Sequence, residues 1–346
     1  MAHFARVTSI VLLTAAAALL GVCGPASAGG RPIFYSTIDA GTGRAHVWEM
    51  DADGSNRHQV TTDDASQQYS PSLSPDGEVV AYSSAIGSNQ QVFTEPIGGG
   101  MIDDISNGTG SMVSESPSYC GDGSIVYLGD HAGNGLWDVY RGGVDVVDTQ
   151  WPGPGGHAQA EYTENDVRCS RTGELSFVRY ADAAHPLPSP DHGGSLTVEL
   201  WTRGPGDPDV GVERTFLNAT GTQQITTVKH ASWSPDGNRI AFIATTQADG
   251  GDQLFTMRSD GADVTRVEDT AGGGTPRGVA WSPDGTQVAY VRSDGEIEEV
   301  TLAGDVDTEI ADVTATGGLS WGGPAPPAGV PISEPAPALP TPPGAT

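Results

Sequence analysis

Short apolar segments recur along the chain, and each is followed by a polar turn and a second segment rich in β-branched and aromatic residues. The clearest copy is Ala231–Gly237, which ends in Ser-Pro-Asp-Gly and leads into Arg239–Ala244. Similar copies begin at Ser72 and at Ala280. Proline presets φ, aspartate bonds the local backbone and glycine accepts a positive φ, so this tetrapeptide favours a tight turn. The pattern predicts a repeated unit of strand, turn and strand.

Weaker copies extend the series. Ser118–Gly123 and Arg168–Gly173 each precede a β-rich segment, whereas Ser320–Gly323 has no second strand behind it. Aligned on the tryptophan position, the copies place the following residues in one column: Leu73, Tyr119, Cys169, Trp233, Trp281 and Trp321. Successive members of this column are 40 to 64 residues apart. That spacing is close to the period of a four-stranded propeller blade.

The first repeat lacks its innermost strand. Pro32–Ser36 matches the second strand of the other repeats, and His46–Met50 follows as a third. The unpaired first strand at Leu319–Trp321 can supply the missing one, and this closes the ring without leaving an open sheet edge. We therefore predict an all-β fold, a six-bladed β-propeller over residues 31–323 that is closed by a C-terminal strand completing the first blade.

Residues 1–28 have the pattern of a signal peptide. Arg6 is followed by an apolar run over Val7–Leu20 and by small residues at Ala26–Ala28. The run is too short to span a bilayer comfortably. Leu20–Cys23 also resembles a lipoprotein cleavage box, but Val22 fits that pattern poorly, so we favour cleavage after Ala28. We expect a protein exported to the periplasm or cell envelope, or secreted, with no transmembrane segment after cleavage.

Two further segments depart from the repeat. Residues 324–346 are dominated by proline and alanine, and this composition predicts an extended, disordered tail. The fourth repeat is lengthened by an insertion, Ala181–Gly194, between its second and third strands. Such an insertion is either a functional loop on a rigid scaffold or tolerated decoration.

The composition and net charge of the chain indicate its fold class and the kind of molecule that it can bind. Glycine (48) and proline (25) are frequent and charged residues make up 17% of the chain, which fits a turn-rich all-β fold. The formal net charge of −28 argues against nucleic-acid binding, because phosphate contacts need clustered Lys and Arg. The charge favours a cation or a basic partner, or simply a well-solvated acidic surface. We expect a monomer.

Signal cleavage removes Cys23 and leaves Cys120 and Cys169. Both stand on the innermost-strand motif of neighbouring repeats, one position apart in the alignment. In an oxidising compartment two such cysteines can form a disulfide. The alternative is two buried thiols that pack as small apolar groups. The sequence leaves both alternatives open.

The Trp-Ser-Pro-Asp-Gly motif, followed by a Gln-Leu-Phe or Gln-Val-Phe strand and a Ser-Asp-Gly turn, resembles the propeller repeat of the TolB family, a WD40-like Pro-Asp repeat. The likeness covers residues 31–323, and Trp233–Gly237 and Trp281–Gly285 match best. TolB itself carries an α/β domain before its propeller, so the resemblance concerns the propeller part only. It implies a six-bladed scaffold that presents one ring face and its central channel to a protein partner. Related propellers hold a divalent cation such as calcium in that channel, although no ligand set for one stands out here.

Candidate binding residues follow from propeller topology, in which the loops entering the innermost strands surround one mouth of the central channel. We place the candidate partner-binding site at the following residues of these loops: Tyr69, Glu115, Asp166, His230 and Arg277. Acidic, basic and aromatic side chains together suit recognition, although ordinary solvated loops have a similar composition. No His-Glu-x-x-His or paired Cys-x-x-Cys spacing for a metal occurs. We assign no catalytic residue.

Three functions compete on this basis. The first is a non-enzymatic, exported scaffold that binds a protein or cell-envelope component at the channel mouth. The second is a secreted carbohydrate-active enzyme, a polysaccharide lyase or glycosidase, with its cleft at the same mouth. The third is a ligand- or cation-sensing module. We favour the first, because a rigid ring with one enlarged blade on that face suits recognition.

Overall fold

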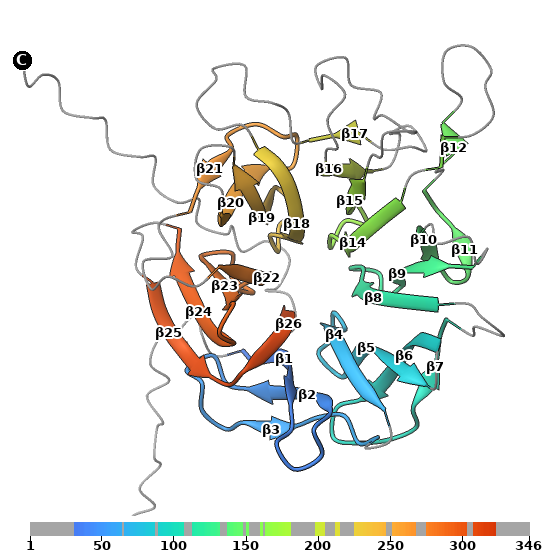
Figure 1. Ribbon diagram of the computed structural model, residues 1–346, viewed down its shortest axis with the longest axis vertical. Coiled ribbons are helices and arrows are strands. Elements are labelled where there is room, and N and C mark those ends of the chain that lie inside the picture. The colour runs from blue at the N-terminus through green and yellow to red at the C-terminus, as the bar shows by residue number, and fades with distance from the viewer. Residues whose placement is uncertain are drawn as a thin grey trace, which may run out of the picture.

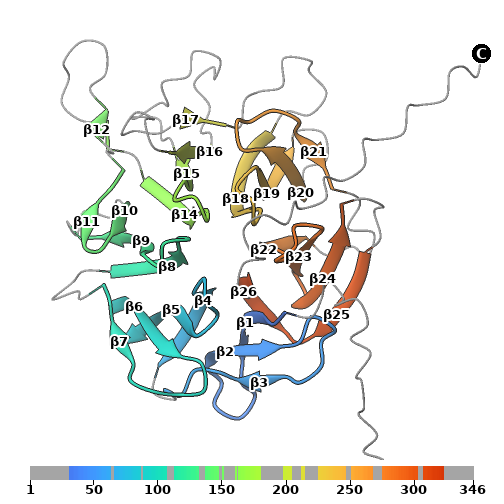
Figure 2. The same ribbon diagram turned by 180° about the vertical axis from the view of Figure 1, so that it is seen from behind.

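The computed structural model describes residues 31–322, apart from breaks at 64–65, 87–88, 107–112, 132–136, 148–149, 152–159, 162, 181–197, 205–211, 215–224, 247–250, 268–274 and 303–306. In this part of the chain every regular element is a β-strand. The strands form six four-stranded sheets that stand as blades around a common axis (Figure 1; seen from behind in Figure 2). The prediction of a six-bladed propeller is confirmed. The predicted signal peptide, the fourth-repeat insertion and the Pro/Ala-rich tail lie outside the described residues.

Each blade is described from its innermost strand outward. The first blade contains β26 (Ala315–Trp321), β1 (Ile33–Ile38), β2 (Ala45–Met50) and β3 (His58–Gln59). The second contains β4 (Gln67–Leu73), β5 (Val79–Ile86), β6 (Asn89–Pro96) and β7 (Asp103–Asp104). The third contains β8 (Val113–Tyr119), β9 (Ile125–Asp130), β10 (Asp138–Arg141) and β11 (Val144–Asp145).

The fourth blade follows a separate hairpin formed by β12 (Gln150–Trp151) and β13 (Ala160–Glu161). It contains β14 (Thr163–Cys169), β15 (Leu175–Tyr180), β16 (Val198–Arg203) and β17 (Val212–Glu213). The fifth contains β18 (Ile225–Trp233), β19 (Arg239–Thr246), β20 (Asp252–Arg258) and β21 (Thr265–Arg266). The sixth contains β22 (Pro276–Trp281), β23 (Gln287–Arg292), β24 (Glu296–Thr301) and β25 (Asp307–Asp312).

The predicted closure of the ring is confirmed. Strand β26 pairs antiparallel with β1, with Trp321 opposite Ile33. The indole Nε1 of Trp321 donates to the carbonyl oxygen of Arg31 at 3.1 Å. The first and last described strands therefore share one blade, which leaves no unpaired innermost edge at the point where the ring closes.

The Ser-Pro-Asp-Gly segments form the turns after the innermost strands. In the second blade, the Gly77 amide donates to the Ser74 carbonyl at 2.9 Å, and φ of Gly77 is +80°. The Ser74 hydroxyl donates to the Asp76 carboxylate. Asp284 accepts an equivalent bond from Ser282 at 2.8 Å in the sixth blade. These carboxylates therefore stabilise the turns, as turn chemistry predicts.

Apolar side chains fill the spaces between neighbouring blades. Ile243 of the fifth blade and Trp281 of the sixth belong to one buried cluster. Val126 of the third blade and Phe177 of the fourth belong to another. Because each blade packs mainly on its two neighbours, a circle of similar interfaces holds the innermost strands at the axis.

Candidate functional site at the central channel

The five predicted binding residues lie inside innermost strands, so their placement in the entering loops is wrong. Tyr69, Glu115, Asp166, His230 and Arg277 belong to β4, β8, β14, β18 and β22, one on each of five consecutive blades. The physical reason is a β-bulge in each of these strands, after which pairing resumes in a shifted register. The strands therefore begin earlier than the alignment suggested.

The bulges carry left-handed backbone at non-glycine residues in three blades. The φ angles of Ser70, Ser116 and Asp166 are +52°, +53° and +47°. Left-handed φ is unfavourable for residues with a Cβ and persists where the surrounding structure enforces it. The recurrence of the bulge on successive blades therefore divides the innermost strands into an amino-terminal and a carboxyl-terminal part, and the predicted residues lie in the bulge or next to it.

Asp166 and His230 are brought together at the junction of the fourth and fifth blades. Asp166 is buried, and its Oδ2 accepts the Ala231 amide at 2.7 Å. Its Oδ1 lies 2.8 Å from Arg168 Nη2 and 3.6 Å from His230 Nδ1. Burial by itself raises the pKa of Asp166, but the Arg168 charge, His230 and the Ala231 amide together hold that pKa below its ordinary value. The carboxylate thus links two blades, and its negative charge is balanced within the protein.

The other three predicted residues stand on separate blades. Glu115 is half-buried, and burial raises the pKa of its carboxyl although a hydrogen bond from Gln90 opposes the shift. Tyr69 is partly exposed, its hydroxyl bonds the Gln67 side chain, and burial raises its pKa. Arg277 is exposed. These side chains keep surface available to a partner, whereas Asp166 serves the blade junction.

A cavity of about 160 Å³ lies on the axis at the other half of the innermost strands. Every blade contributes to it through the carboxyl-terminal end of its innermost strand or the turn that follows. The polar residues that matter below are Ser72, Ser118, Arg168, Arg171, Ser232 and Ser320. None of the five predicted residues lines this cavity. Sequence analysis therefore missed it.

Serine hydroxyls at the cavity wall join one innermost strand to the next. Ser320 Oγ accepts the Leu73 amide at 3.3 Å, Ser72 Oγ accepts the Tyr119 amide at 3.0 Å, and Ser118 Oγ accepts the Cys169 amide at 3.0 Å. These bonds connect the first four blades in sequence. Each hydroxyl accepts an amide proton and keeps its own proton to donate.

One of these serines stands in a Gly-x-Ser-x-Gly spacing, Gly318–Gly322. In a hydrolase that spacing marks a sharp turn between a strand and a helix, where the serine is a nucleophile. Here Ser320 lies within strand β26 and accepts the Leu73 amide. The cavity lining contains neither a carboxylate nor an imidazole. The geometry therefore lacks the general base that a serine nucleophile needs.

The fourth blade differs from the others where it meets the cavity. Arg168 occupies the position that is serine in four other blades, at Ser72, Ser118, Ser232 and Ser320. Arg171 occupies the position that is proline in three, at Pro75, Pro235 and Pro283. Burial lowers the pKa of Arg171, and the charge of Arg31 lowers it further. The sequence clue was the imperfect motif Arg168–Gly173, in which two arginines replace the neutral serine and proline of the other copies.

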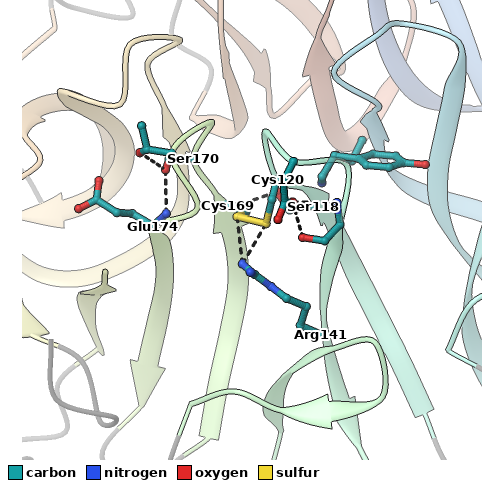
Figure 3. Close-up of a disulfide and its surroundings, with 11 residues drawn as sticks. Ser118, Cys120, Arg141, Cys169, Ser170 and Glu174 are labelled. Carbon is teal, nitrogen blue, oxygen red and sulfur yellow. Dashed lines mark hydrogen bonds between the residues drawn. A yellow bond between two sulfur atoms is a disulfide. The ribbon is translucent and has the colours of Figure 1, made fainter. Parts of the chain in front are cut away.

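A disulfide holds this part of the fourth blade to the third. Cys120 and Cys169 are bonded, with their Cα atoms 4.9 Å apart. Arg141 Nη2 lies 3.2 Å from the sulfur of Cys120 and 3.6 Å from that of Cys169 (Figure 3). Gly121, next to the disulfide, packs directly on the turn of the fourth blade, since a Cβ there would lie 2.0 Å from the Arg171 carbonyl oxygen. The cross-link thus fixes the backbone that carries Arg171.

Comparison with known proteins finds several solved structures with a similar fold. No family model and no curated protein matches the sequence. TolB from Acinetobacter baumannii superposes with a TM-score of 0.61 at 17% identity, covering 86% of this chain and 68% of that one. The putative TolB from Agrobacterium tumefaciens gives a TM-score of 0.52 at 16% identity, covering 83% of this chain and 91% of that one. The fold is that of a TolB-like propeller.

The same architecture occurs in larger proteins of other kinds. The tricorn protease matches this chain with a TM-score of 0.53 at 18% identity, covering 82% of this chain and 26% of that one. Identities this low concern the fold alone. Within the described residues, no group of three or more His, Cys, Asp and Glu side chains is arranged to hold a metal ion. That part of the chain also contains no helix of the length and apolarity needed to cross a membrane.

Proposed function

We propose that this chain is an exported TolB-like propeller that acts as a scaffold for a protein or cell-envelope partner. The partner binds the channel-mouth face, defined by Tyr69, Glu115, Asp166, His230 and Arg277. The observation that carries the proposal is that these residues occur beside the same β-bulge on five consecutive blades. A ring of packed sheets presents them without a loss of backbone freedom on binding, which favours affinity.

Export is supported by two independent features. The first is the signal-peptide pattern of residues 1–28. The second is the disulfide between Cys120 and Cys169, because disulfides persist mainly in oxidising compartments. We infer a periplasmic, cell-envelope or secreted location. Mass spectrometry of the protein from its native host would test this, with Gly29 expected as the first residue.

The net charge of −28 bears on the partner. A partner with a basic surface would associate faster, and the association rate would fall with added salt. Arg277 is exposed on the channel-mouth face and Tyr69 is partly exposed, so both can contact a partner without supporting a blade junction. Aromatic and arginine side chains are the usual sources of binding energy at interfaces.

The test uses these two residues. Crosslinking of the purified protein in envelope extracts should capture a specific partner, and the double variant Tyr69→Ala, Arg277→Ala should reduce capture at least about tenfold. The matched control is Arg258→Ala, which removes an exposed arginine paired with Asp260 on the outer part of the fifth blade. Equal capture by wild type and the double variant, with unchanged thermal stability, would place the interface elsewhere.

The alternative of a carbohydrate-active enzyme is less well supported. A glycosidase needs paired carboxylates at its cleft, and the two predicted acids of the channel-mouth face, Glu115 and Asp166, stand on different blades. At the channel-mouth face, Asp166 is already committed to Arg168 and to the Ala231 amide. We therefore favour the scaffold.

A further inference from the structure

Two arginines without an acidic partner stand at or beside the axial cavity. Arg171 lines the cavity from the fourth blade. Arg31 precedes β1 in the first blade, and its carbonyl oxygen accepts the indole N–H of Trp321, another lining residue. Arg31 Nη1 is enclosed and has no hydrogen-bond partner. The Arg31 charge acts on Arg171 closely enough to lower its pKa, in addition to the larger effect of burial. The backbone of Arg31 is therefore held beside a lining residue, and its charge lies near enough to Arg171 to be felt there.

No carboxylate compensates this pair in the described part of the chain, where neither Arg31 nor Arg171 forms an ion pair. Arg168 also lines the cavity, but Asp166 lies 2.8 Å from its Nη2, so its charge is balanced. Arg31 and Arg171 are both partly buried, and it is unfavourable for a charge to lose water without gaining a counter-charge. In a chain with a net charge of −28, two uncompensated cations at one point call for an explanation.

The acidic residues of the neighbouring turns do not supply the missing charge. Asp76 and Asp236 accept hydrogen bonds from Ser74 and Ser234 of their own turns. Asp122 and Asp284 do the same with Ser124 and Ser282. The turn of the fourth blade has Thr172 at this position. Among the Ser-x-x-Gly turns described above, the turn that contains Arg171 is therefore the one with no aspartate before its glycine.

Neutral donors line the cavity together with Arg171. Ser72, Ser118 and Ser320 line the cavity, and each accepts a backbone amide through its oxygen. Their hydroxyl protons are thereby left to donate. The disulfide and the Gly121 contact fix the Arg171 backbone. A cavity lined by Arg171 and by hydroxyl donors, with no acid in its lining and the charge of Arg31 beside it, is chemically complementary to an oxyanion.

We propose that the axial cavity binds an oxyanion, a carboxylate or phosphate group, at Arg171, with the charge of Arg31 beside the site. A volume of about 160 Å³ is large enough for one such group together with waters. The site is distinct from the channel-mouth face, because it is built from the carboxyl-terminal ends of the innermost strands. It adds a small-ligand or chain-end binding function to the scaffold and does not depend on the proposed partner.

The experiment is isothermal titration calorimetry at low ionic strength, in a buffer free of carboxylate and phosphate. Inorganic phosphate and acetate are the two probes, and sodium chloride at matched ionic strength is the reference. Wild type should bind at least one probe saturably with one site per chain and should melt at a higher temperature in its presence. Arg171→Gln should weaken binding about tenfold or more, because it removes a charge-assisted hydrogen bond.

Control variants distinguish binding at this specific site from nonspecific attraction of the anion to any positive charge. Arg258→Gln removes an exposed arginine far out on the fifth blade and should leave the affinity unchanged. Arg171→Lys keeps the charge without the planar fork and should give an intermediate loss. If Arg171→Gln unfolds by circular dichroism, Arg31→Gln provides the same comparison. Arg277→Ala should bind the anion like wild type, so failure of the partner-binding proposal would leave this one standing.

The two probes also identify the ligand class. Preference for phosphate indicates a phosphorylated ligand, preference for acetate indicates a carboxylate such as a chain end, and equal binding supports an oxyanion site that accepts either. The proposal is overturned if neither probe saturates, if chloride competes equally, or if Arg171→Gln and Arg258→Gln weaken binding to the same extent.

Discussion

Trp321 lies directly opposite Ile33 in the antiparallel pair of β26 and β1, so the last described strand of the chain completes the blade that the first one begins. Both side chains belong to one buried cluster with residues of the sixth blade. The entropic cost of closing so long a chain grows only slowly with its length. In return, the ring loses the exposed innermost edge at which another chain could pair.

Removal of the Trp321 side chain should therefore open the ring. The residue is 7% exposed, and its indole donates to the Arg31 carbonyl. We expect Trp321→Ala to lower the free energy of unfolding by about 3–5 kcal/mol, measured by urea denaturation. Met101→Ala is the control, because Met101 is 74% exposed and its loss should have almost no effect. A cost for Trp321→Ala as small as that of the control would contradict the role of β26 as the closing strand.

The disulfide should contribute strongly to stability. Cys120 and Cys169 are 49 residues apart in sequence, and a loop of that length corresponds to about 4 kcal/mol in the chain-entropy account. We expect reductant to lower the melting temperature of wild type and to have no effect on the double variant Cys120→Ser, Cys169→Ser. Because the same bond fixes the turn of Arg171, the double variant should also bind the oxyanion more weakly. Insensitivity of wild type to reductant would contradict the first expectation.

Two glycines with similar backbone conformation test the contact between the sixth and first blades. Gly278 has φ +67°, and a Cβ there would lie 1.8 Å from the Gly317 carbonyl oxygen. Gly143 has φ +80° with no atom within 4 Å of an added Cβ. Gly143→Ala should cost about 1 kcal/mol from backbone strain alone, and Gly278→Ala about 2 kcal/mol more from the clash. Denaturant unfolding measures both, and equal costs would mean that the blades separate easily here.

Asp166 predicts a pH dependence of stability. Its folded-state pKa is below the ordinary value, so its carboxylate contributes stability that is present above the unfolded pKa and is lost as the pH falls through the folded pKa. Asp166→Asn should destabilise the protein by about 3 kcal/mol near neutral pH, because Arg168 loses its partner. The difference from wild type should shrink below about pH 5. Urea midpoints measured across this range provide the test, and a constant difference would rule out the ion pair as the cause.

The repeat was readable from local chemistry. Segments such as Ala231–Gly237 combine a β-rich strand with a turn whose residues set their own φ angles, and this holds wherever the turn stands in the fold. The orphan strand ending at Trp321 was recognisable because Pro32–Ser36 lacked an innermost neighbour. The ends of the strands were harder to predict from the sequence. Tyr69 and Arg277 were expected in loops, because a β-bulge leaves no clear mark in the alternation of polar and apolar residues.

Local sequence chemistry was thus sufficient for six blades and their closure, because strands and tight turns depend on a few adjacent residues. It left the bonding of Cys120 and Cys169 open, and it gave no reason to join Arg31 with Arg171. Those pairs come from different blades, and they meet only when the twist and radius of the closed ring bring distant strands to a common axis. Their physical meaning also depends on that arrangement, since an arginine in solvent needs no counter-charge, whereas one that is partly buried near the axis is stabilised by one.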